Sequence, residues 1–513
     1  MAKNRVSSSE LDGVQYRRAK LWQIILVACN GLNGMAVYVL IGQASYAASI
    51  GFGISTLIIG GLLTFTRVFD AITDPLLAFL YDRVNTRWGK IRPLMLLGWA
   101  VQSLGIMSMF SWAASKGFGI GMFIATYLLY VIGYTIVNMT AQTIPALITN
   151  DPKQRPTVGV WFTVFNYLVP MIFTIVLNTV LLPRFGEATA DGAANYNQGY
   201  LTAAAIATVA VSLLGVILVC IGVAAFDKPE NFKGTNKAQE RLKFKDMWNV
   251  LKNNKPLQAF IISASSDKIA QQAGAAAVVT TMLFGILIGN MTIATYLSVG
   301  SMLPSIIFAI IGAKYCGKHG NKESIVTWAR RCIWANLAMI AFFTAVWSTV
   351  GTTTIAGLGV TMALYILLTL VGNGFMMAGT TANTAFMADI IDYELDRSGK
   401  YIPAVVSGTY SLIDKIVSSF SALIATGCVA LIGYTATLPQ PGDKPTVSIF
   451  AVTMFLRYGL AIFGWICTLL AMRKCKLGKA EMVEVQKRIE DKKEELKHKV
   501  IEDELHKGDP ENA

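Results

Sequence analysis

Long apolar blocks alternate with short polar stretches along most of the chain. Blocks such as LMLLGWAVQSLGIMSMF and IATVAVSLLGVILVCIGVAAF belong to segments near or above the ~20 apolar residues that a membrane-spanning helix needs. The pattern predicts an all-α integral membrane protein with twelve transmembrane helices. The predicted spans lie at about 21–48, 52–81, 93–113, 120–148, 157–183, 199–226, 257–286, 291–313, 324–347, 353–386, 402–434 and 446–473.

The predicted spans divide into two sets of six, because the longest basic loop, 227–256, follows the sixth span. YDRVNTRWGKIRP after span two and GAKYCGKHGNKES after span eight occupy matching places, a faint sign of duplication. Transporters built from two such halves bind substrate near the bilayer midplane between them. We therefore expect an N-terminal segment 1–20, a first half 21–226, a central loop 227–256, a second half 257–473 and a tail 474–513.

The tail carries apolar residues at positions 482, 485, 489, 496, 500 and 505 with dense mixed charge between them. This spacing predicts a cytoplasmic helix, either a short coiled coil or a surface helix. About 40 residues are too few for a separate folded domain.

Composition and charge agree with a membrane protein. The chain is 54% hydrophobic and 15% charged, whereas soluble domains carry about 25% charged residues. The net charge of +13 collects in alternate loops, such as DRVNTRWGKIR and TNDPKQRPT, and the other loops contain only Lys116, Arg184 and Lys444. Because cytoplasmic loops hold the excess of Lys and Arg, we expect both termini in the cytoplasm and no nucleic-acid partner. The polar first twenty residues predict no cleaved signal peptide.

Enzyme chemistry and a resident metal are both disfavoured. The seven cysteines form no C-x-x-C pair, and the three histidines (His319, His498 and His506) lie outside the predicted spans. No Ser-His-Asp set or glycine-rich phosphate loop stands out. We expect no enzyme and no organic cofactor, which leaves binding and movement.

Three charged residues occur together in RVFDAITD, inside the second predicted span. Asp70 and Asp74 share one helix face with Arg67, although one ionisable group near the bilayer centre costs about 3 kcal/mol. Two carboxylates beside one arginine leave a net negative charge that can hold H⁺, Na⁺ or Li⁺, with Thr73 offering a hydroxyl oxygen. The alternative is a structural salt bridge, which explains only one of the two carboxylates.

Other polar residues lie within the predicted spans. Lys415 is placed to balance the charge of span two. Span one carries Asn33, and Tyr134, Asn138 and Gln142 form a stripe on span four that suits a neutral, hydroxyl-rich solute, although a single Asn often only joins helices. The most polar patch of the second half, which either contacts substrate or faces the aqueous mouth, consists of Asp267, Lys268, Gln271 and Gln272.

Three blocks resemble the glycoside–pentoside–hexuronide:cation symporters. RVFDAITDP with DRVNTRWGKIRP is similar to that family's second helix and first cytoplasmic loop. YTIVN with IPALITNDPKQR is similar to its fourth helix and the loop that follows. MADIIDYELDRSGKYIPAVVSGTYSLIDK is similar to its stretch from helix ten into helix eleven. The resemblance covers essentially all twelve helices and implies the major facilitator fold, a sugar substrate and a coupling ion (Na⁺, Li⁺ or H⁺).

The resemblance also implies roles for single residues. It assigns the coupling cation to Asp70 and Asp74, with Thr73 and Thr135 near it and Lys415 beside the site, and it assigns Tyr134 to the sugar. The candidate gating residues in the loop after span two are Asp82, Arg83, Arg87 and Lys90.

The chain departs from the family at positions that bind galactosides. Sugar-binding aspartates of the family's helices one and four are replaced by Asn33 and Asn138, the helix-five arginine falls near Thr163, and the helix-four tryptophan falls at Gln142. A galactoside is therefore disfavoured. A uronide whose carboxylate meets Lys268, or a neutral pentoside or glucoside, fits these changes.

The sequence thus predicts a monomeric, cation-coupled symporter in the cell's inner (plasma) membrane that imports a glycoside, pentoside or hexuronide by alternating access. Two alternatives stay open. One is a cation-coupled lysolipid transporter, since a vertebrate branch resembles this family. The other is a non-transporting sugar sensor whose output is the tail.

Overall fold

The computed structural model describes residues 18–56, 58–66, 69, 86, 88–114, 117–149, 154–188, 194–228, 244–399, 402–489 and 491. Helices dominate the described ranges, as the apolar blocks predict. The first half contains α2 (Leu21–Ala28), α3 (Asn30–Ile41), α4 (Ala44–Tyr46), η1 (Ala47–Gly51), α6 (Ile91–Met107), η2 (Ser108–Trp112), α7 (Gly119–Ile148), α8 (Arg155–Ile175), η3 (Val176–Leu181), α9 (Leu182–Phe185), β1 (Glu187–Ala188), β2 (Ala194–Asn195) and α10 (Gln198–Val223). Residues 58–66 are also helical.

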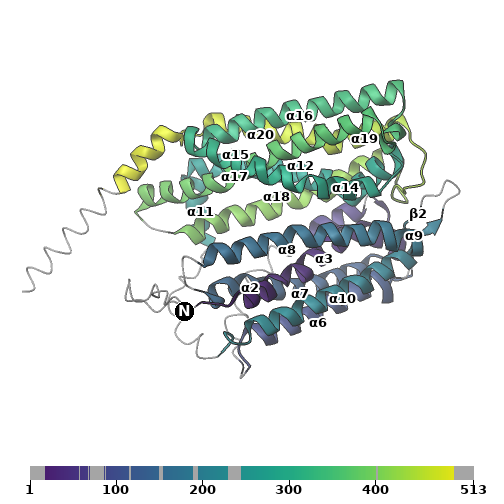
Figure 1. Ribbon diagram of the computed structural model, residues 1–513, viewed down its shortest axis with the longest axis horizontal. Helices are drawn as coiled ribbons and strands as arrows, with labels where there is room; N and C mark the ends of the chain where they lie inside the picture. The colour runs from purple at the N-terminus through teal and green to yellow at the C-terminus, as the bar shows by residue number, and fades with distance from the viewer. Residues whose placement is uncertain are drawn as a thin grey trace, which may run out of the picture.

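The second half contains α11 (Phe244–Asn253), α12 (Lys255–Gly274), α13 (Ala277–Thr280), η6 (Thr281–Leu287), α14 (Thr292–Gly300), α15 (Met302–His319), α16 (Asn321–Thr349), η7 (Thr352–Ala356), α17 (Val360–Ser398), α18 (Pro403–Leu431), α19 (Val447–Met454), η8 (Phe455–Gly459) and α20 (Leu460–Lys474). The two halves form two bundles that lie side by side, with their long helices running in roughly the same direction (Figure 1). The strands β1 and β2 make one short antiparallel hairpin at one end of the first bundle.

Within the described ranges, nine helices are long and apolar enough to cross a membrane, and a bent helix pair makes a possible tenth. That pair joins Lys255–Gly274 to Ala277–Leu287 with a bend of 54°. Two predicted spans are missing from this set. Half of the second span, 52–81, lies outside the described residues, and the eighth is divided at Ser301 into α14 and α15. The all-helical membrane architecture is confirmed, whereas the number twelve and the orientation of the termini stay predictions.

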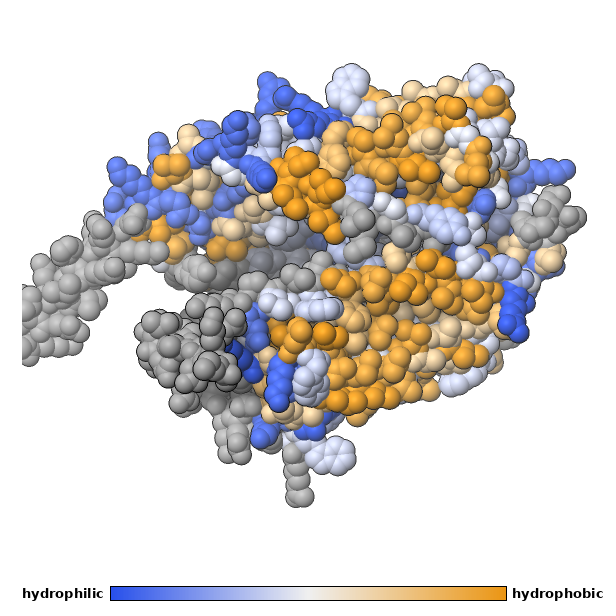
Figure 2. Space-filling view, viewed as in Figure 1, coloured by the Kyte–Doolittle hydropathy of each residue, from blue (hydrophilic) through white to orange (hydrophobic). Residues whose placement is uncertain are grey.

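The outer surface of both bundles is apolar along the middle of the helices. Figure 2 shows hydrophobic residues covering both bundles, whereas hydrophilic residues gather at the end that holds α11 and the helix after α20. Exposed apolar side chains on α10 and α15 include Ile206, Leu214, Ile217, Ile306, Ile307 and Ile310. An exposed apolar surface of this extent is what contact with lipid tails requires.

Small residues let α6 and α7 pack closely in the first half. A Cβ atom on Gly133 of α7 would collide with the backbone of Gln102 on α6, and one on Gly105 would lie 2.6 Å from Tyr130 Cα. Close approach of backbones at glycine is how helices associate when no hydrophobic effect drives them together. This crossing fixes which faces of α6 and α7 point toward the centre of the protein.

Asp227, just after α10, caps the start of α6. Its buried carboxylate accepts hydrogen bonds from the backbone N–H groups of Lys90, Ile91 and Arg92, at 2.8, 3.0 and 2.9 Å. These are donors that the first turn of a helix otherwise leaves without partners. Gly89, with φ of +93°, supplies the turn before the helix, and a Cβ there would collide with Asp227. Lys90, a candidate gating residue, is therefore part of a fixed joint between α6 and α10.

The two halves contact each other at the end that holds residues 435–442. Tyr46 Oη donates to Pro439 O at 2.8 Å, Thr56 N donates to Thr435 O at 3.0 Å, and Gly442 N donates to Asn195 Oδ1 at 3.0 Å. We call this set of contacts the seal. The connecting segments of the seal carry few basic residues, and the predicted orientation would put them on the non-cytoplasmic side.

The loop after α18 holds its shape through Tyr434 and Asp443. The Tyr434 hydroxyl donates to Asp443 Oδ2 at 2.8 Å. Burial raises the pKa of Tyr434 above its ordinary value, and the hydrogen bond to Asp443 raises it further. The tyrosine therefore keeps its proton and remains a donor in this loop.

The first part of the tail is a helix, residues 479–489, that packs on the second half. Val485 and Ile489 are buried, at 0% and 6% exposure, in a cluster that includes Ile390 of α17. Arg488 Nε donates to Asp396 Oδ2 at 2.8 Å. This segment is thus a surface helix with one buried face. The remainder of the tail, apart from residue 491, lies outside the described residues.

Candidate functional site

A cavity of about 510 Å³ lies between the two halves. Helices of both bundles line it: α3, α7 and the helix at 58–66 from the first half, and α12, α13 and α18 from the second. Its volume falls within the ~300–1,000 Å³ typical of small-molecule sites. Its described lining residues are Tyr38, Val39, Ile41, Gly42, Ser45, Leu63, Thr66, Tyr127, Tyr130, Val131, Tyr134, Lys268, Gln272, Ala275, Ala276, Ala277, Val278, Lys415, Ser418, Ser421, Ala422, Ala425 and Thr426.

The wall from the first half is aromatic. Tyr127, Tyr130 and Tyr134 lie three and four residues apart, so α7 presents them on one face. Their rings follow one another with centroid separations of 5.6 and 5.7 Å. Tyr38 of α3 adds a fourth ring to the lining. We call these four residues the tyrosine wall.

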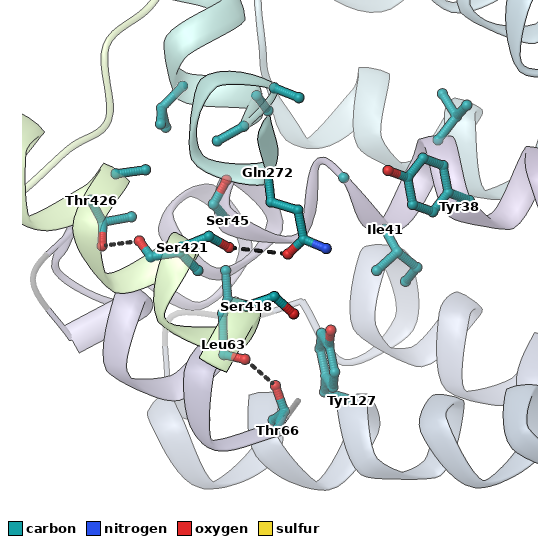
Figure 3. Close-up of a pocket in the computed structure, with 18 of the residues that line it drawn as sticks. Tyr38, Ile41, Ser45, Leu63, Thr66, Tyr127, Gln272, Ser418, Ser421 and Thr426 are labelled. Carbon is teal, nitrogen blue, oxygen red and sulfur yellow. Dashed lines mark hydrogen bonds between the residues drawn. The ribbon is translucent and has the colours of Figure 1, made fainter. Parts of the chain in front are cut away.

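The wall from the second half is polar. Ser421 Oγ of α18 donates to Gln272 Oε1 of α12 at 3.2 Å, as Figure 3 shows. Ser418 and Thr426 of α18 also line the cavity, and their hydroxyls donate to carbonyl oxygens of their own helix at 3.3 and 2.9 Å. Lys415 lies on the same helix and reaches the cavity. We call Gln272, Ser418, Ser421 and Thr426 the polar wall.

An ion pair between α12 and α18 lies beside the polar wall. Lys268 Nζ of α12 contacts Asp414 Oδ2 of α18. Lys268 lines the cavity with 42% of its side chain exposed, whereas the Asp414 side chain is 3% exposed. Asp414 Oδ1 has no hydrogen-bond partner among the described residues. The pair joins α12 to α18 across the wall.

The helical span of α12 breaks where it borders the cavity. The backbone turns by 54° between Gly274 and Ala277, and Ala275, Ala276 and Ala277 line the cavity at this bend. Broken helices are tolerated at membrane depth where they line a cavity, and transporters use them at substrate sites. The small alanines leave this part of the cavity open.

Tyr134, Lys268 and Lys415, three of the residues singled out in the sequence, line the cavity together. Asn33 does not line it. Its Oδ1 accepts a hydrogen bond from Gln102 Nε2 at 2.9 Å, and the residue is 1% exposed. This contact joins α3 to α6, so Asn33 has the helix-joining role that was its alternative.

Gln272, a fourth residue that the sequence selected, also lines the cavity, whereas Thr135, Asn138, Asp267 and Gln271 are not among the described lining residues. Asn138 is exposed and Thr135 is buried at 2% exposure, both outside the lining set. Asp267 is 6% exposed and accepts a hydrogen bond from Gln271 Nε2 at 2.7 Å. Gln142 lies in α7, but its side chain is outside the description.

The predicted cation site lies outside the described residues. This applies to Arg67, Asp70, Thr73 and Asp74, and also to the gating candidates Asp82, Arg83 and Arg87. The cavity does reach Thr66, the residue directly before Arg67. Thr66 therefore adjoins the predicted site in the sequence, and the site itself stays a prediction.

Sequence analysis missed most of the lining. Of the tyrosine wall it selected Tyr134 alone, although the spacing of Tyr127, Tyr130 and Tyr134 was a signal that could have revealed the stripe. Ser418 and Ser421 occur in KIVSSFSA, where serine in an apolar span resembles a packing residue. Tyr38 gave no pattern of its own.

Comparison with known proteins agrees with this geometry. The family model described as "MFS/sugar transport protein" matches residues 26–474. YagG of Escherichia coli strain K12, a predicted glycoside/cation symporter, is 24% identical over 391 residues, or 75% of this chain and 77% of that protein. The isoprimeverose transporter of Lactiplantibacillus pentosus is 22% identical over 392 residues, 76% of this chain and 75% of that protein. The resemblance noted in the sequence is therefore confirmed.

A solved structure shows the same fold. A mutant form of the nucleoside transporter NupG superposes with a TM-score of 0.59 at 13% identity, over 88% of this chain and 99% of that one. Proteins of this family and fold are transporters and not enzymes. Because the family model spans both halves and the interface that holds the cavity, the chain belongs to the MFS/sugar transport protein family.

Proposed function

We propose that this protein is a cation-coupled sugar symporter of the inner membrane that binds its substrate in the cavity between the two halves. One observation carries the proposal: in a member of a sugar transport family, a wall of four tyrosines faces a wall of amide, hydroxyl and ammonium groups. A sugar has apolar C–H faces and a rim of hydroxyls, so it needs both kinds of surface.

The sealed end of the interface supports alternating access. The seal joins the halves on one side of the cavity through contacts such as Tyr46 with Pro439. Gly60 lets the helix at 58–66 approach α18 closely, because a Cβ there would collide with Thr426. For transport, these contacts between halves must break when the cavity opens toward that side.

The coupling ion is assigned to Asp70 and Asp74 from the sequence. They follow the cavity residue Thr66 by four and eight positions, a spacing that would put all three on one face of the helix predicted from the sequence. A cation that neutralises these carboxylates next to the cavity would favour sugar binding there. By linkage, sugar would favour cation binding equally.

The substrate class follows from the relatives' names and from the charge of the lining. One relative is an isoprimeverose transporter, and another, 22% identical over 429 residues, is a glucuronide carrier protein homolog of E. coli. The described lining contains two lysines and no carboxylate. We infer a neutral or acidic glycoside as the substrate, and a cationic sugar is disfavoured.

The test is gradient-driven uptake into proteoliposomes, with a panel of isoprimeverose, lactose, methyl β-D-glucuronide and simple pentosides, under Na⁺, Li⁺ or H⁺ gradients. We expect at least one sugar to accumulate, and Asp70→Asn or Asp74→Asn to abolish accumulation. Glu484→Gln, at an exposed carboxylate of the tail helix, is the matched control. Accumulation that survives both aspartate changes would contradict the coupling site, and no uptake or binding of any sugar would contradict the substrate class.

A further inference from the structure

We propose that the two halves divide the recognition of the sugar. The tyrosine wall stacks on an apolar face of the ring, and the polar wall recognises the hydroxyls, with Gln272 as the specificity-determining residue and Ser421 as the residue that positions it. The inference rests on the proposed function, because it assigns an orientation to a sugar in the same cavity. The sequence predicted sugar-binding residues in both halves, Asn33 and Asn138 in the first and the patch from Asp267 to Gln272 in the second, and the inference narrows hydroxyl specificity to Gln272.

The asymmetry of the lining carries the argument. Among the described lining residues, all four aromatic side chains come from α3 and α7 of the first half. The amide and both ammonium groups come from α12 and α18 of the second half. Because the Tyr127 and Tyr130 rings meet edge to face, at 83°, a sugar ring stacks on one of the tyrosines at a time. Stacked there, it presents its hydroxyl-bearing edge to α12 and α18.

Gln272 has the geometry of a fixed recognition group. Its Oε1 accepts the hydrogen bond from Ser421, which is 2% exposed and so has a well-defined position. Figure 3 shows the amide nitrogen on the far side of the carboxamide from Ser421, directed into the space toward Tyr38 and Tyr127. An amide that is held at its oxygen presents its N–H donors in one orientation.

The neighbouring hydroxyls make Gln272 harder to replace. Thr66, Ser418 and Thr426 each donate to a carbonyl oxygen of their own helix, at 3.0, 3.3 and 2.9 Å. In this arrangement they offer a ligand mainly acceptor lone pairs. A sugar hydroxyl oxygen needs a donor as well, and in the polar wall Gln272 is the amide that provides one.

The two asparagines of the first half that the sequence selected for the sugar, Asn33 and Asn138, are not among the described lining residues. Asn33 Oδ1 accepts a hydrogen bond from Gln102 Nε2. Helix α10 packs on the backbone of Asn33, since a Cβ on Gly215 would lie 2.9 Å from Asn33 N. Asn138 lies outside the lining. Hydroxyl recognition by the first half would have to come from Ser45, Thr66 and the tyrosine hydroxyls.

The experiment pairs variants of the purified full-length protein with deoxy sugars. Binding of isoprimeverose, lactose and methyl β-D-glucuronide is measured calorimetrically, and the sugar that binds is then compared with its series of single-deoxy analogues. For each variant the readout is the ratio of Kd for a deoxy analogue to Kd for the parent sugar. This ratio does not depend on the fraction of protein that is folded.

In the wild type we expect the loss of one particular sugar hydroxyl to raise Kd by about three- to tenfold, the effect of one neutral hydrogen bond. In Gln272→Leu the parent sugar should bind several-fold more weakly, and the ratio at that hydroxyl should fall to about 1, because both changes remove the same interaction. Ser421→Ala should lower the ratio partly. Tyr127→Leu should weaken all analogues alike and leave the ratio as in the wild type.

Two further variants serve as controls. Gln258→Leu changes a glutamine on the same helix whose amide bonds to Leu251 O at 2.7 Å outside the cavity, and it should bind like the wild type. Gln272→Asn, which keeps an amide but shortens it, replaces Gln272→Leu if that variant does not fold, and it should also lower the ratio.

The outcomes separate the two proposals. If a sugar binds but the ratio is unchanged in Gln272→Leu or Gln272→Asn, the division of recognition is overturned and the proposed function stands. A ratio that falls in Tyr127→Leu and not in the Gln272 variants would place hydroxyl recognition on the first half, which also overturns the division and leaves the proposed function intact. If the wild type binds no sugar of the panel, the proposed function fails and this inference fails with it.

Discussion

The ion pair between Lys268 and Asp414 predicts an unequal response to the loss of its two members. Asp414 is buried, with one carboxylate oxygen on Lys268 and the other without a partner among the described residues. Lys268→Met would leave a buried carboxylate without the one ion pair that it makes among the described residues. Asp414→Leu would leave a lysine that already reaches the cavity and can turn its ammonium group toward water. Lys268→Met should therefore be the more destabilising change.

The magnitude follows from burial. Breaking a buried ion pair costs about 3–5 kcal/mol when a charge is left behind. Since 42% of the Lys268 side chain is exposed, solvent screens the pair, and we expect the lower end, about 3 kcal/mol. The unfolding entropy of globular proteins, about 2.1 cal/mol/K per residue, then gives a fall in Tm of about 3 °C for a chain of 513 residues. Asp414→Leu should lower Tm by about 1 °C or less.

Thermal unfolding of the purified protein in detergent measures all three variants. The double variant Lys268→Met/Asp414→Leu should recover most of the loss, because well-packed apolar residues replace a buried pair at little cost. Lys487→Met, at an exposed lysine of the tail helix, controls for the loss of a positive charge. An equal cost for the two single variants, or no recovery in the double variant, would refute the reasoning.

Three further predictions concern the joints of the fold. Asp227→Asn should lower the free energy of unfolding by about 2 kcal/mol, because a neutral amide accepts fewer of the three backbone hydrogen bonds. It should also speed hydrogen exchange in the first turn of α6, and unchanged exchange would contradict the capping role of Asp227. Gly60→Val should push the helix at 58–66 away from Thr426 and open the seal, so that a cysteine placed at Tyr38 is labelled faster from the seal side. Val485→Asp should release the tail helix from the second half, because a charge in this buried apolar position weakens the packing by about 3 kcal/mol. Limited proteolysis of the tail should then be faster, and a tail that stays resistant would refute the packing.

The sequence was informative where one helix could be considered alone. Apolar blocks predicted the spans because lipid requires about twenty apolar residues in a row, and the prediction failed to show the bend after Gly274 or the break at Ser301. Both lie inside segments that are apolar overall, so the alternation of apolar blocks and polar stretches does not mark them. The tail helix was likewise predicted from its spacing, but not the burial of Val485, which depends on α17.

The site likewise could be predicted from the sequence only in part. Tyr134, Lys268 and Lys415 were selected as polar residues within predicted transmembrane spans, and they line the cavity. Asn33 was selected for the same reason, yet it joins α3 to α6. Periodicity says which residues share a face of a helix, but not which way that face turns. The rotation of α3, α6 and α7 is set by backbone contacts at Gly105, Gly133 and Gly215.

The sequence by itself determined that the chain crosses a membrane many times, since lipid requires long apolar segments whose backbone groups are all hydrogen-bonded. It also predicted two halves and two carboxylates inside one span, because charge in lipid is costly. Only the tertiary structure decided that four tyrosines of the first half and the Gln272 amide of the second half line one cavity. That arrangement depends on contacts between residues such as Gly60 and Thr426, or Gln272 and Ser421, which are far apart in the chain. No local pattern encodes the distance between two helices, because packing of the whole bundle sets it.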